Sequence, residues 1–205
     1  MTRALLWVDI QNDFLPGGAL AVPRGDEVIA VANRLAQVGC HALVVATQDF
    51  HPPGHGSFAS QHPGARPYDQ GELAGLPQTF WPDHCVQGTA GAELAAGLDR
   101  ARLARVVQKG TDPRIDSYSG FFDNARRKAT GLEAVLRQAG VTEIDVVGLA
   151  TDYCVKATVL DALELGFAVR IFEAGVRAVD LAPGDGARAI SAMREAGAQI
   201  VEEVP

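Results

Sequence analysis

The chain has 205 residues, of which 47% are hydrophobic and 21% charged, and this composition excludes a disordered chain and leaves enough apolar material for a sizeable core. Eighteen Lys and Arg residues against 25 Asp and Glu residues give a net charge of −7, so the sequence lacks the broad basic surface that nucleic-acid binding requires. The apolar runs are far shorter than the roughly 18 to 20 residues that cross a bilayer, and we recognise no cleavable signal, so we expect a cytoplasmic protein without a membrane partner.

The N-terminal part of the chain predicts a strand–helix–strand unit. The uninterrupted apolar run Ala4–Val8 is typical of a strand covered on both faces, as in a parallel sheet. Apolar residues then recur at helical spacing between Asp26, a candidate N-cap, and Gly39, a glycine of the kind that ends helices. A second apolar run, Ala42–Ala46, predicts the next strand.

A long irregular stretch rich in Gly and Pro follows, from Phe50 to about Gly88. Loops of this length are uncommon inside a compact domain and usually form lids or binding sites. We therefore expect a lid or binding loop at about residues 50–90, and the candidate ligands His51 and His84 described below make it a metal-binding loop region.

The rest of the chain continues the alternation of helices and strands. The pattern Thr130–Glu133 is a capping box that opens a helix, Gly140 ends it, and Thr151 is the candidate N-cap of a further helix. The predicted elements are a short helix at 92–98, a strand at 105–108, an irregular segment at 111–124, a helix at 130–140, a strand at 144–149, a helix at 151–166, a strand at 167–172, a helix at 183–196 and an edge strand at 199–201. This alternation predicts a three-layer α/β/α fold around a mainly parallel sheet of about six strands, in a single domain over residues 1–205.

Reactive side chains follow the predicted strands. Asp9 follows the first strand, Asp49 and His51 the second, Lys109 the third, and Asp152 and Cys154 the fourth. Because the ligand crevice of an open parallel sheet lies outside the carboxyl ends of its strands, we expect these side chains to converge on one edge.

Cys154 is a candidate nucleophile. It lies near the start of the helix capped by Thr151, where unpaired N–H groups and the helix dipole favour a thiolate. Asp9 can take the thiol proton and later pass it to a leaving group, while the Lys109 ammonium holds both groups charged. Taken one at a time, the alternatives are a small buried hydrophobe for the cysteine, a surface ion for the lysine and a loop cap for the aspartate. Their shared edge favours a catalytic role for all three.

Asp49 and His51 form a candidate metal site, since side chains two apart on an extended segment point to the same side. His84 would supply a third ligand, and three protein ligands leave positions open for substrate or water. The alternative for an isolated histidine in a Pro-rich loop is an exposed or backbone-bonded imidazole.

The other histidines, His41, His55 and His62, lack equivalent placement, although His55 and Ser57 are near enough in the chain to be outer-shell residues of the metal site. We interpret Cys85, which adjoins His84, as structural. Three cysteines are an odd count, so we expect no disulfide framework.

Several segments of the sequence resemble the motifs of one family. They are Asp9–Phe14, Thr47–Pro52, Trp81–Thr89, Lys109–Gly110, Tyr118–Phe121 and Leu149–Val155. Together they resemble the bacterial nicotinamidases, also called pyrazinamidases, in the isochorismatase-like hydrolase superfamily. The aspartate, lysine and cysteine motifs mark the superfamily, whereas the Asp-x-His pair with Trp-Pro-Asp-His-Cys is more particular to nicotinamidases.

The resemblance implies hydrolysis of nicotinamide to nicotinate and ammonia, a step in NAD salvage, and also deamidation of pyrazinamide. It implies that Asp9, Lys109 and Cys154 form the catalytic triad and that the cysteine carries a thioester intermediate.

The resemblance also implies a divalent metal ion on Asp49, His51 and His84 that meets the pyridine nitrogen. Zinc is the first expectation, with iron or manganese as alternatives. A cis peptide bond between Leu149 and Ala150 is a further implication.

Other residues would serve the same reaction. The backbone N–H groups of Ala150 and Cys154, at the helix start, are placed to stabilise the tetrahedral oxyanion. Phe14 and Trp81 belong to loops that reach the crevice and would cover the faces of the pyridine ring, with Tyr118 as a further wall. The alternative for these aromatic residues is core packing.

Two other functions remain open. A different superfamily member would act on isochorismate or an N-carbamoyl compound, and its metal motif would be idle. A metal- or nucleotide-binding module is the non-enzymatic alternative, but no glycine-rich phosphate loop follows a predicted strand. The expected partner is the small-molecule substrate, and assembly into a homo-oligomer is open.

Overall fold

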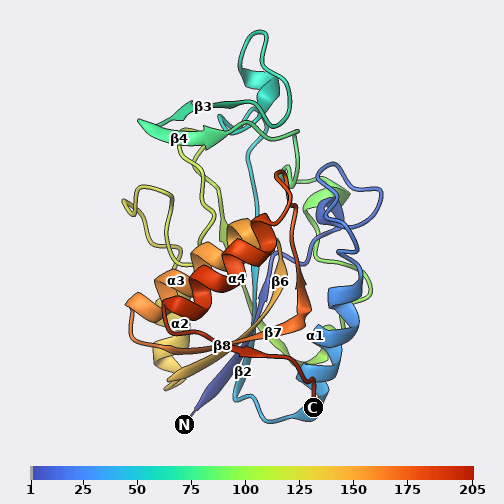
Figure 1. The fold of residues 1–205 in the computed structure, drawn as a ribbon, viewed down its shortest axis with the longest axis vertical. Coiled ribbons are helices and arrows are strands. Elements are labelled where there is room, and N and C mark those ends of the chain that lie inside the picture. The colour runs from blue at the N-terminus through green and yellow to red at the C-terminus, as the bar shows by residue number, and fades with distance from the viewer. Residues whose placement is uncertain (1) are drawn as a thin grey trace.

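The computed structural model describes residues 2–205 and contains one large parallel sheet (Figure 1). Within these residues the sheet has six strands in the order β5-β2-β1-β6-β7-β8, and every neighbouring pair is parallel. The strands are β1 (Arg3–Val8), β2 (Leu43–Asp49), β5 (Leu103–Lys109), β6 (Glu143–Leu149), β7 (Ala168–Arg177) and β8 (Gln199–Val201). The predicted parallel sheet and the edge position of its last strand are confirmed.

Helices cover both faces of this sheet. They are α1 (Glu27–Val38), α2 (Leu132–Gln138), α3 (Lys156–Glu164) and α4 (Asp185–Glu195). Figure 1 shows α1 on one side of the sheet and the other three on the opposite side. Alternate side chains of β1 belong to two separate cores: Leu5 and Trp7 pack with residues of α1, whereas Leu6 packs with residues of α2, α3 and α4. This double burial explains why the strand reads as an unbroken apolar run.

Two predicted helix starts differ from the structure. At α2 the N-cap is Gly131, with φ 98°, and the Thr130 N–H donates to the Phe121 carbonyl while Glu133 pairs with Arg137. The predicted capping box is therefore wrong, because the Thr130 N–H and the Glu133 carboxylate each have another partner, although Thr130 Oγ1 still accepts the N–H of Leu132 at 3.2 Å.

The helix after β6 begins with an unusual turn. Residues Thr151–Val155 form a π-helical turn, in which the Val155 N–H donates to the Ala150 carbonyl, and α3 continues from it. The N-cap is thus Ala150, one residue before the predicted Thr151. The Leu149–Ala150 peptide bond is cis, as the family resemblance implies.

The region at 50–90 is more regular than its composition suggests. It contains the antiparallel hairpin of β3 (Gln70–Leu73) and β4 (Leu76–Thr79), which lies beyond one end of the large sheet in Figure 1. It also contains a 3₁₀ turn at Ala59–Gln61; similar turns lie at Asn12–Phe14, Ala90–Ala92 and Arg100–Arg102.

The predicted helix at 92–98 is wrong. Beyond the turn at Ala90–Ala92 the chain runs beside the loop after β1, where the Ala95 N–H donates to the Ile10 carbonyl and the Asn12 N–H to the Glu93 carbonyl. Its apolar side chains are buried by this pairing with a distant loop, which sequence spacing does not reveal.

Within residues 2–205, no helix has both the length and the apolar character that crossing a membrane requires.

Candidate active site and metal centre

Four predicted site residues meet at the carboxyl edge of the sheet. Asp9 comes directly after β1, Asp49 ends β2, Lys109 ends β5, and Cys154 lies in the π turn after β6. All four side chains are buried. The predicted convergence of these four residues is therefore present in the structure.

Lys109 lies at the centre of the group. Its Nζ is 3.0 Å from Asp9 Oδ2, 3.0 Å from Asp49 Oδ1 and 3.5 Å from Cys154 Sγ, and it donates to the Ser117 carbonyl at 2.8 Å. Burial opposes the ammonium charge, but the Asp49 and Asp9 carboxylates outweigh burial and raise the pKa of Lys109 well above its usual value. The lysine is a fixed cation between two carboxylates.

Asp9 has one oxygen committed and one available. Oδ1 accepts the Thr47 hydroxyl at 2.6 Å. Oδ2 faces the Lys109 ammonium, but it receives no directional hydrogen bond from any residue that the structure describes. Burial raises the pKa of Asp9, although Lys109 acts in the opposite direction. This combination suits a group that accepts a proton and gives it back.

Cys154 differs electrostatically from the sequence-based expectation of a thiolate. Burial raises the pKa of the thiol well above its usual value; Lys109 lowers it, but the carboxylates of Asp9 and Asp49 add to the effect of burial. The cysteine is thus held as a thiol, and a base must remove its proton when it attacks. Asp9 is the adjacent base.

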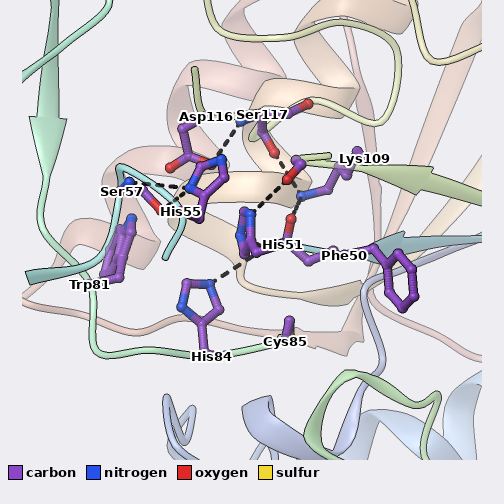
Figure 2. Close-up of polar contacts among 12 residues, drawn as sticks. Phe50, His51, His55, Ser57, Trp81, His84, Cys85, Lys109, Asp116 and Ser117 are labelled. Atoms are coloured by element: carbon purple, nitrogen blue, oxygen red, sulfur yellow. Dashed lines mark hydrogen bonds and ion pairs between the residues drawn. The ribbon is translucent and has the colours of Figure 1, made fainter. Parts of the chain in front are cut away.

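Asp49, His51 and His84 bring ligand atoms together beside this group. One carboxylate oxygen and two imidazole nitrogens lie within 4.8 Å of one another, and all three residues are buried. Asp49 Oδ2 is 3.2 Å from His51 Nε2 and 3.5 Å from His84 Nε2. Figure 2 shows both rings converging from separate segments of the loop region.

The hydrogen bonds of the two histidines fit a metal site. His51 Nδ1 donates to the Gly110 carbonyl at 2.9 Å, and His84 Nδ1 donates to the Pro82 carbonyl at 2.8 Å. Because a carbonyl oxygen accepts only, each Nδ1 carries a proton, and each Nε2 is therefore the nitrogen that can bind a cation in place of its own proton. Burial favours the neutral form of Asp49, but His51 and Lys109 outweigh it and hold its pKa well below the usual range. The donor set suits a divalent ion.

Gly110 is required by this arrangement. Its φ is 65°, and a Cβ at this position would lie 2.5 Å from His51 Cε1 and 2.9 Å from Asp49 Oδ1. The turn after Lys109 therefore approaches the metal ligands more closely than any other residue type permits.

His55 lies beside His51, with ring centroids 4.3 Å apart (Figure 2). Both of its nitrogens are hydrogen-bonded. Nε2 donates to the Asp112 carbonyl at 2.9 Å, and Nδ1 accepts the Ser57 hydroxyl at 2.8 Å. His51, His55 and Asp116 also bring ligand atoms within 4.8 Å of one another. In this hydrogen-bonded state His55 packs against the His51 ring, and both of its nitrogens are already bound to protein groups.

His41 and His62 lie elsewhere. His41 Nε2 is 2.8 Å from Asp145 Oδ2, and Asp145 is on β6. The His62 ring stacks on Phe80 with centroids 3.7 Å apart. Cys85 is buried, and like Cys40 and Cys154 it is a free thiol.

A narrow cavity is lined by the thiol of Cys154 and by two of the candidate metal ligands, Asp49 and His84. The predicted ring contacts Phe14, Trp81 and Tyr118 all line it. The full lining is Phe14, Leu20, Asp49, Trp81, His84, Asp116, Tyr118, Ala150, Tyr153, Cys154 and Val179. Trp81 is edge-on to Tyr153, with centroids 4.8 Å apart, and its Nε1 donates to the Tyr118 hydroxyl at 3.3 Å.

Sequence reasoning missed four residues of this lining: Leu20, Asp116, Tyr153 and Val179. Tyr153 adjoins Cys154 within the segment Leu149–Val155. The position of the candidate nucleophile could therefore have indicated that Tyr153 lines the cavity. Leu20 and Val179 reach the cavity from loops after β1 and β7, and their sequence context carries no comparable signal.

Asp152, which was expected at the same edge, is turned away from the thiol. Its carboxylate accepts the N–H groups of Val179 at 3.0 Å and Asp180 at 2.9 Å. Asp152 therefore fixes the loop after β7 to the π turn.

A larger open hollow of about 440 Å³ runs along the outer edge of β5. It is lined by β5 and by parts of residues 110–135, and it includes Lys109 but neither the other catalytic candidates nor the metal ligands. We assign the chemistry to the narrow cavity, where the reactive groups meet.

The fold and this site define the class of protein. The family model Isochorismatase domain matches residues 3–203, and the chain belongs to this family of α/β hydrolases. It is 55% identical over 201 residues to the nicotinamidase of Escherichia coli, across 97% of this chain and 93% of that protein.

Solved structures of relatives share the fold. The nicotinamidase/pyrazinamidase of Acinetobacter baumanii superposes with a TM-score of 0.93 at 41% identity, across 98% of this chain and 95% of that one. The pyrazinamidase of Pyrococcus horikoshii, solved in complex with zinc, superposes with a TM-score of 0.79 at 37% identity, across 99% of this chain and 100% of that one.

Proposed function

We propose that the protein is a nicotinamidase, which hydrolyses nicotinamide to nicotinate and ammonia and also deamidates pyrazinamide. One observation supports the proposal most directly: the buried thiol of Cys154 and two of the three candidate metal ligands, Asp49 and His84, line one aromatic-walled cavity. The similarity to nicotinamidases over nearly the whole chain supports the same activity.

Asp49, His51 and His84 hold a divalent ion in this proposal. Zinc is the first candidate because the Pyrococcus horikoshii relative was solved with it, while one carboxylate and two imidazoles also suit iron and manganese. When bound, the ion supplies a Lewis acid for the pyridine nitrogen and so helps to fix the ring.

The chemical steps fall to Cys154 and Asp9. As Sγ bonds to the carboxamide carbon, Asp9 Oδ2 takes the thiol proton, and the carbonyl oxygen becomes an oxyanion stabilised by the N–H groups of Ala150 and Cys154. Asp9 then protonates the nitrogen, the C–N bond breaks and ammonia departs. The acyl group remains on Cys154 as a thioester. Water attacks the thioester with Asp9 again as base, which releases nicotinate and restores the thiol.

Lys109 stabilises the negative charges that arise in this cycle. Its ammonium stabilises Asp9 when that group is ionised, and it lowers the energy of the anionic sulfur from 3.5 Å away. The lysine itself transfers no proton, because its pKa is raised well above the usual value.

The aromatic residues bind the substrate ring. Phe14, Trp81, Tyr118 and Tyr153 line the cavity and would cover the faces of a flat ring whose carboxamide points to Cys154. Orientation of the amide against the thiol contributes several kcal/mol to the lowering of the barrier. A place in NAD salvage, a single domain over residues 1–205 and a cytoplasmic location belong to the same proposal.

Ammonia release by the purified protein tests the function. Nicotinamide should be turned over, whereas an N-carbamoyl compound or isochorismate should not. Failure to release ammonia from nicotinamide in the presence of zinc, iron or manganese would reject the proposal.

A further inference from the structure

The loop after β1 contacts both halves of the site. Asp9 begins it, the side chain of Gln11 binds the backbone of Asp49, and the carboxylate of Asp13 accepts the Cys85 N–H at 2.7 Å, directly after His84. Three alternate residues of one short loop thus contact the triad and two metal-binding segments.

The Gln11 contacts are the most complete. The side chain is 0% exposed, Nε2 donates to the carbonyls of Asp49 and Ala92 at 2.8 Å each, and Oε1 accepts the Asp49 N–H at 2.8 Å. The N–H and the carbonyl of Asp49 are bound by opposite ends of the Gln11 side-chain amide. The hydrogen-bond network therefore fixes the orientation of that amide.

Gln11 binds the last part of β2, which β1 does not reach. β1 pairs with β2 only as far as Trp7 and Ala46, whereas β2 continues to Asp49. Lys109 of β5 pairs with Asp49 on the other side. The Gln11 amide therefore hydrogen-bonds the edge of β2 that β1 leaves unpaired, where a buried N–H and a buried carbonyl would otherwise lack partners.

We propose that Gln11 is a positioning residue that holds the Asp49 carboxylate between the metal-binding histidines and Lys109. With the Asp49 backbone fixed on both sides, Oδ2 faces the two imidazoles and Oδ1 faces the ammonium. The inference rests on the metal site of the proposed function, and it adds a residue that reaches the ion only through Asp49.

The neighbouring Gln48 provides a matched control. It is also a buried glutamine, and its Nε2 also donates to the Ala92 carbonyl at 2.8 Å, but its Oε1 accepts from Gln108. Gln11→Met and Gln48→Met each remove a buried amide and a bond to Ala92. Only the first removes the two bonds to Asp49.

The experiment measures metal binding without substrate. Zinc affinity is determined by competition with a chromogenic chelator, and the visible absorption spectrum of the cobalt-loaded protein reports the ligand geometry. Loss of a bond that orients a metal ligand typically costs 10- to 100-fold in affinity. We expect Gln11→Met to bind zinc about 10- to 100-fold more weakly, with an altered cobalt spectrum, and Gln48→Met to resemble the wild type.

Equal losses in the two variants, or wild-type affinity and spectrum in Gln11→Met, would overturn the inference. If Gln11→Met does not fold, Gln11→Glu replaces it, because it keeps an acceptor for the Asp49 N–H and loses both donated bonds. The proposed function fails separately, when the wild type binds metal but releases no ammonia from nicotinamide.

Discussion

Asp49 and Lys109 are paired twice. They are register partners at the ends of β2 and β5, and their side chains form an ion pair of 3.0 Å. Asp49 belongs to the candidate metal site and Lys109 contacts the thiol, so the parallel register of two strands sets the spacing between the two halves of the candidate site.

Replacing Lys109 should therefore damage both stability and activity. Lys109→Met leaves the Asp9 and Asp49 carboxylates buried without their cation, and we expect a loss of about 3 to 5 kcal/mol in the free energy of unfolding. We also expect kcat to fall at least about a hundredfold. Urea denaturation and ammonia release measure the two effects, with the exposed Lys128→Met as control; an unchanged midpoint would contradict the buried-pair argument.

Cys154→Ala should abolish turnover while nicotinamide still binds, because the thiol makes the bond and the ring pocket holds the substrate. Asp9→Asn should be nearly as damaging, since it removes the proton acceptor. The double variant should be hardly slower than either single one, because the two residues act as a unit. Calorimetric binding and ammonia release measure these effects, and substantial turnover by Cys154→Ala would exclude the covalent mechanism.

One divalent ion per chain should copurify with the protein. His51→Ala and His84→Ala should each lose it while the sheet remains folded, and activity should fall on chelation and return with added metal. His62→Ala is the control, because His62 instead stacks on Phe80. Elemental analysis that finds the ion undiminished in both ligand variants would remove these residues from the site.

Phe14→Ala and Trp81→Ala should each lower kcat/KM for nicotinamide about tenfold or more, since the loss of about 1.4 kcal/mol is a factor of ten. Metal content and the rate of Cys154 alkylation should change little. A variant that loses metal and thiol reactivity together would show that its ring holds the His84 loop, and a full-rate Trp81→Ala enzyme would place that ring in core packing.

A separate acid-sensitive cluster lies away from the catalytic site. Burial would raise the pKa of Asp145, but hydrogen bonds from His41 and Arg170 outweigh burial and hold that pKa below its usual value. A lowered carboxyl pKa stabilises the fold above the unfolded value of about 3.9, and this contribution is lost as the pH falls through the folded pKa.

Asp145→Asn should therefore lower the free energy of unfolding at neutral pH, and the difference from the wild type should shrink below about pH 4. Urea denaturation across pH 3 to 7 measures this trend. A difference that stays constant with pH would mean that the loss comes from packing and not from the charge.

The sequence predicted the features that depend on local pattern. The apolar run of β1, the left-handed Gly39 that ends α1, and the reactive residues at strand ends all follow from spacing and residue type. The β3–β4 hairpin was missed because Gln70–Thr79 is polar and includes Gly and Pro, so it lacks a clear alternation.

Long-range contacts explain the remaining errors. The predicted helix at 92–98 gives way to pairing with Ile10 and Asn12, which lie far away in the sequence. The thiolate expected at Cys154 depended on the helix start, whereas complete burial and carboxylates from other strands raise the pKa of the thiol in the folded chain. Tertiary surroundings decided both outcomes.

The protonated state of Cys154 has a consequence for the resting enzyme. Oxidants attack thiolates that solvent can reach, and this sulfur is both buried and held as a thiol. In the proposed mechanism the thiolate forms when Asp9 takes the proton of Cys154. Under peroxide stress the exposed Cys40 should thus be oxidised first, and the enzyme should keep its capacity for turnover after that surface thiol has been consumed.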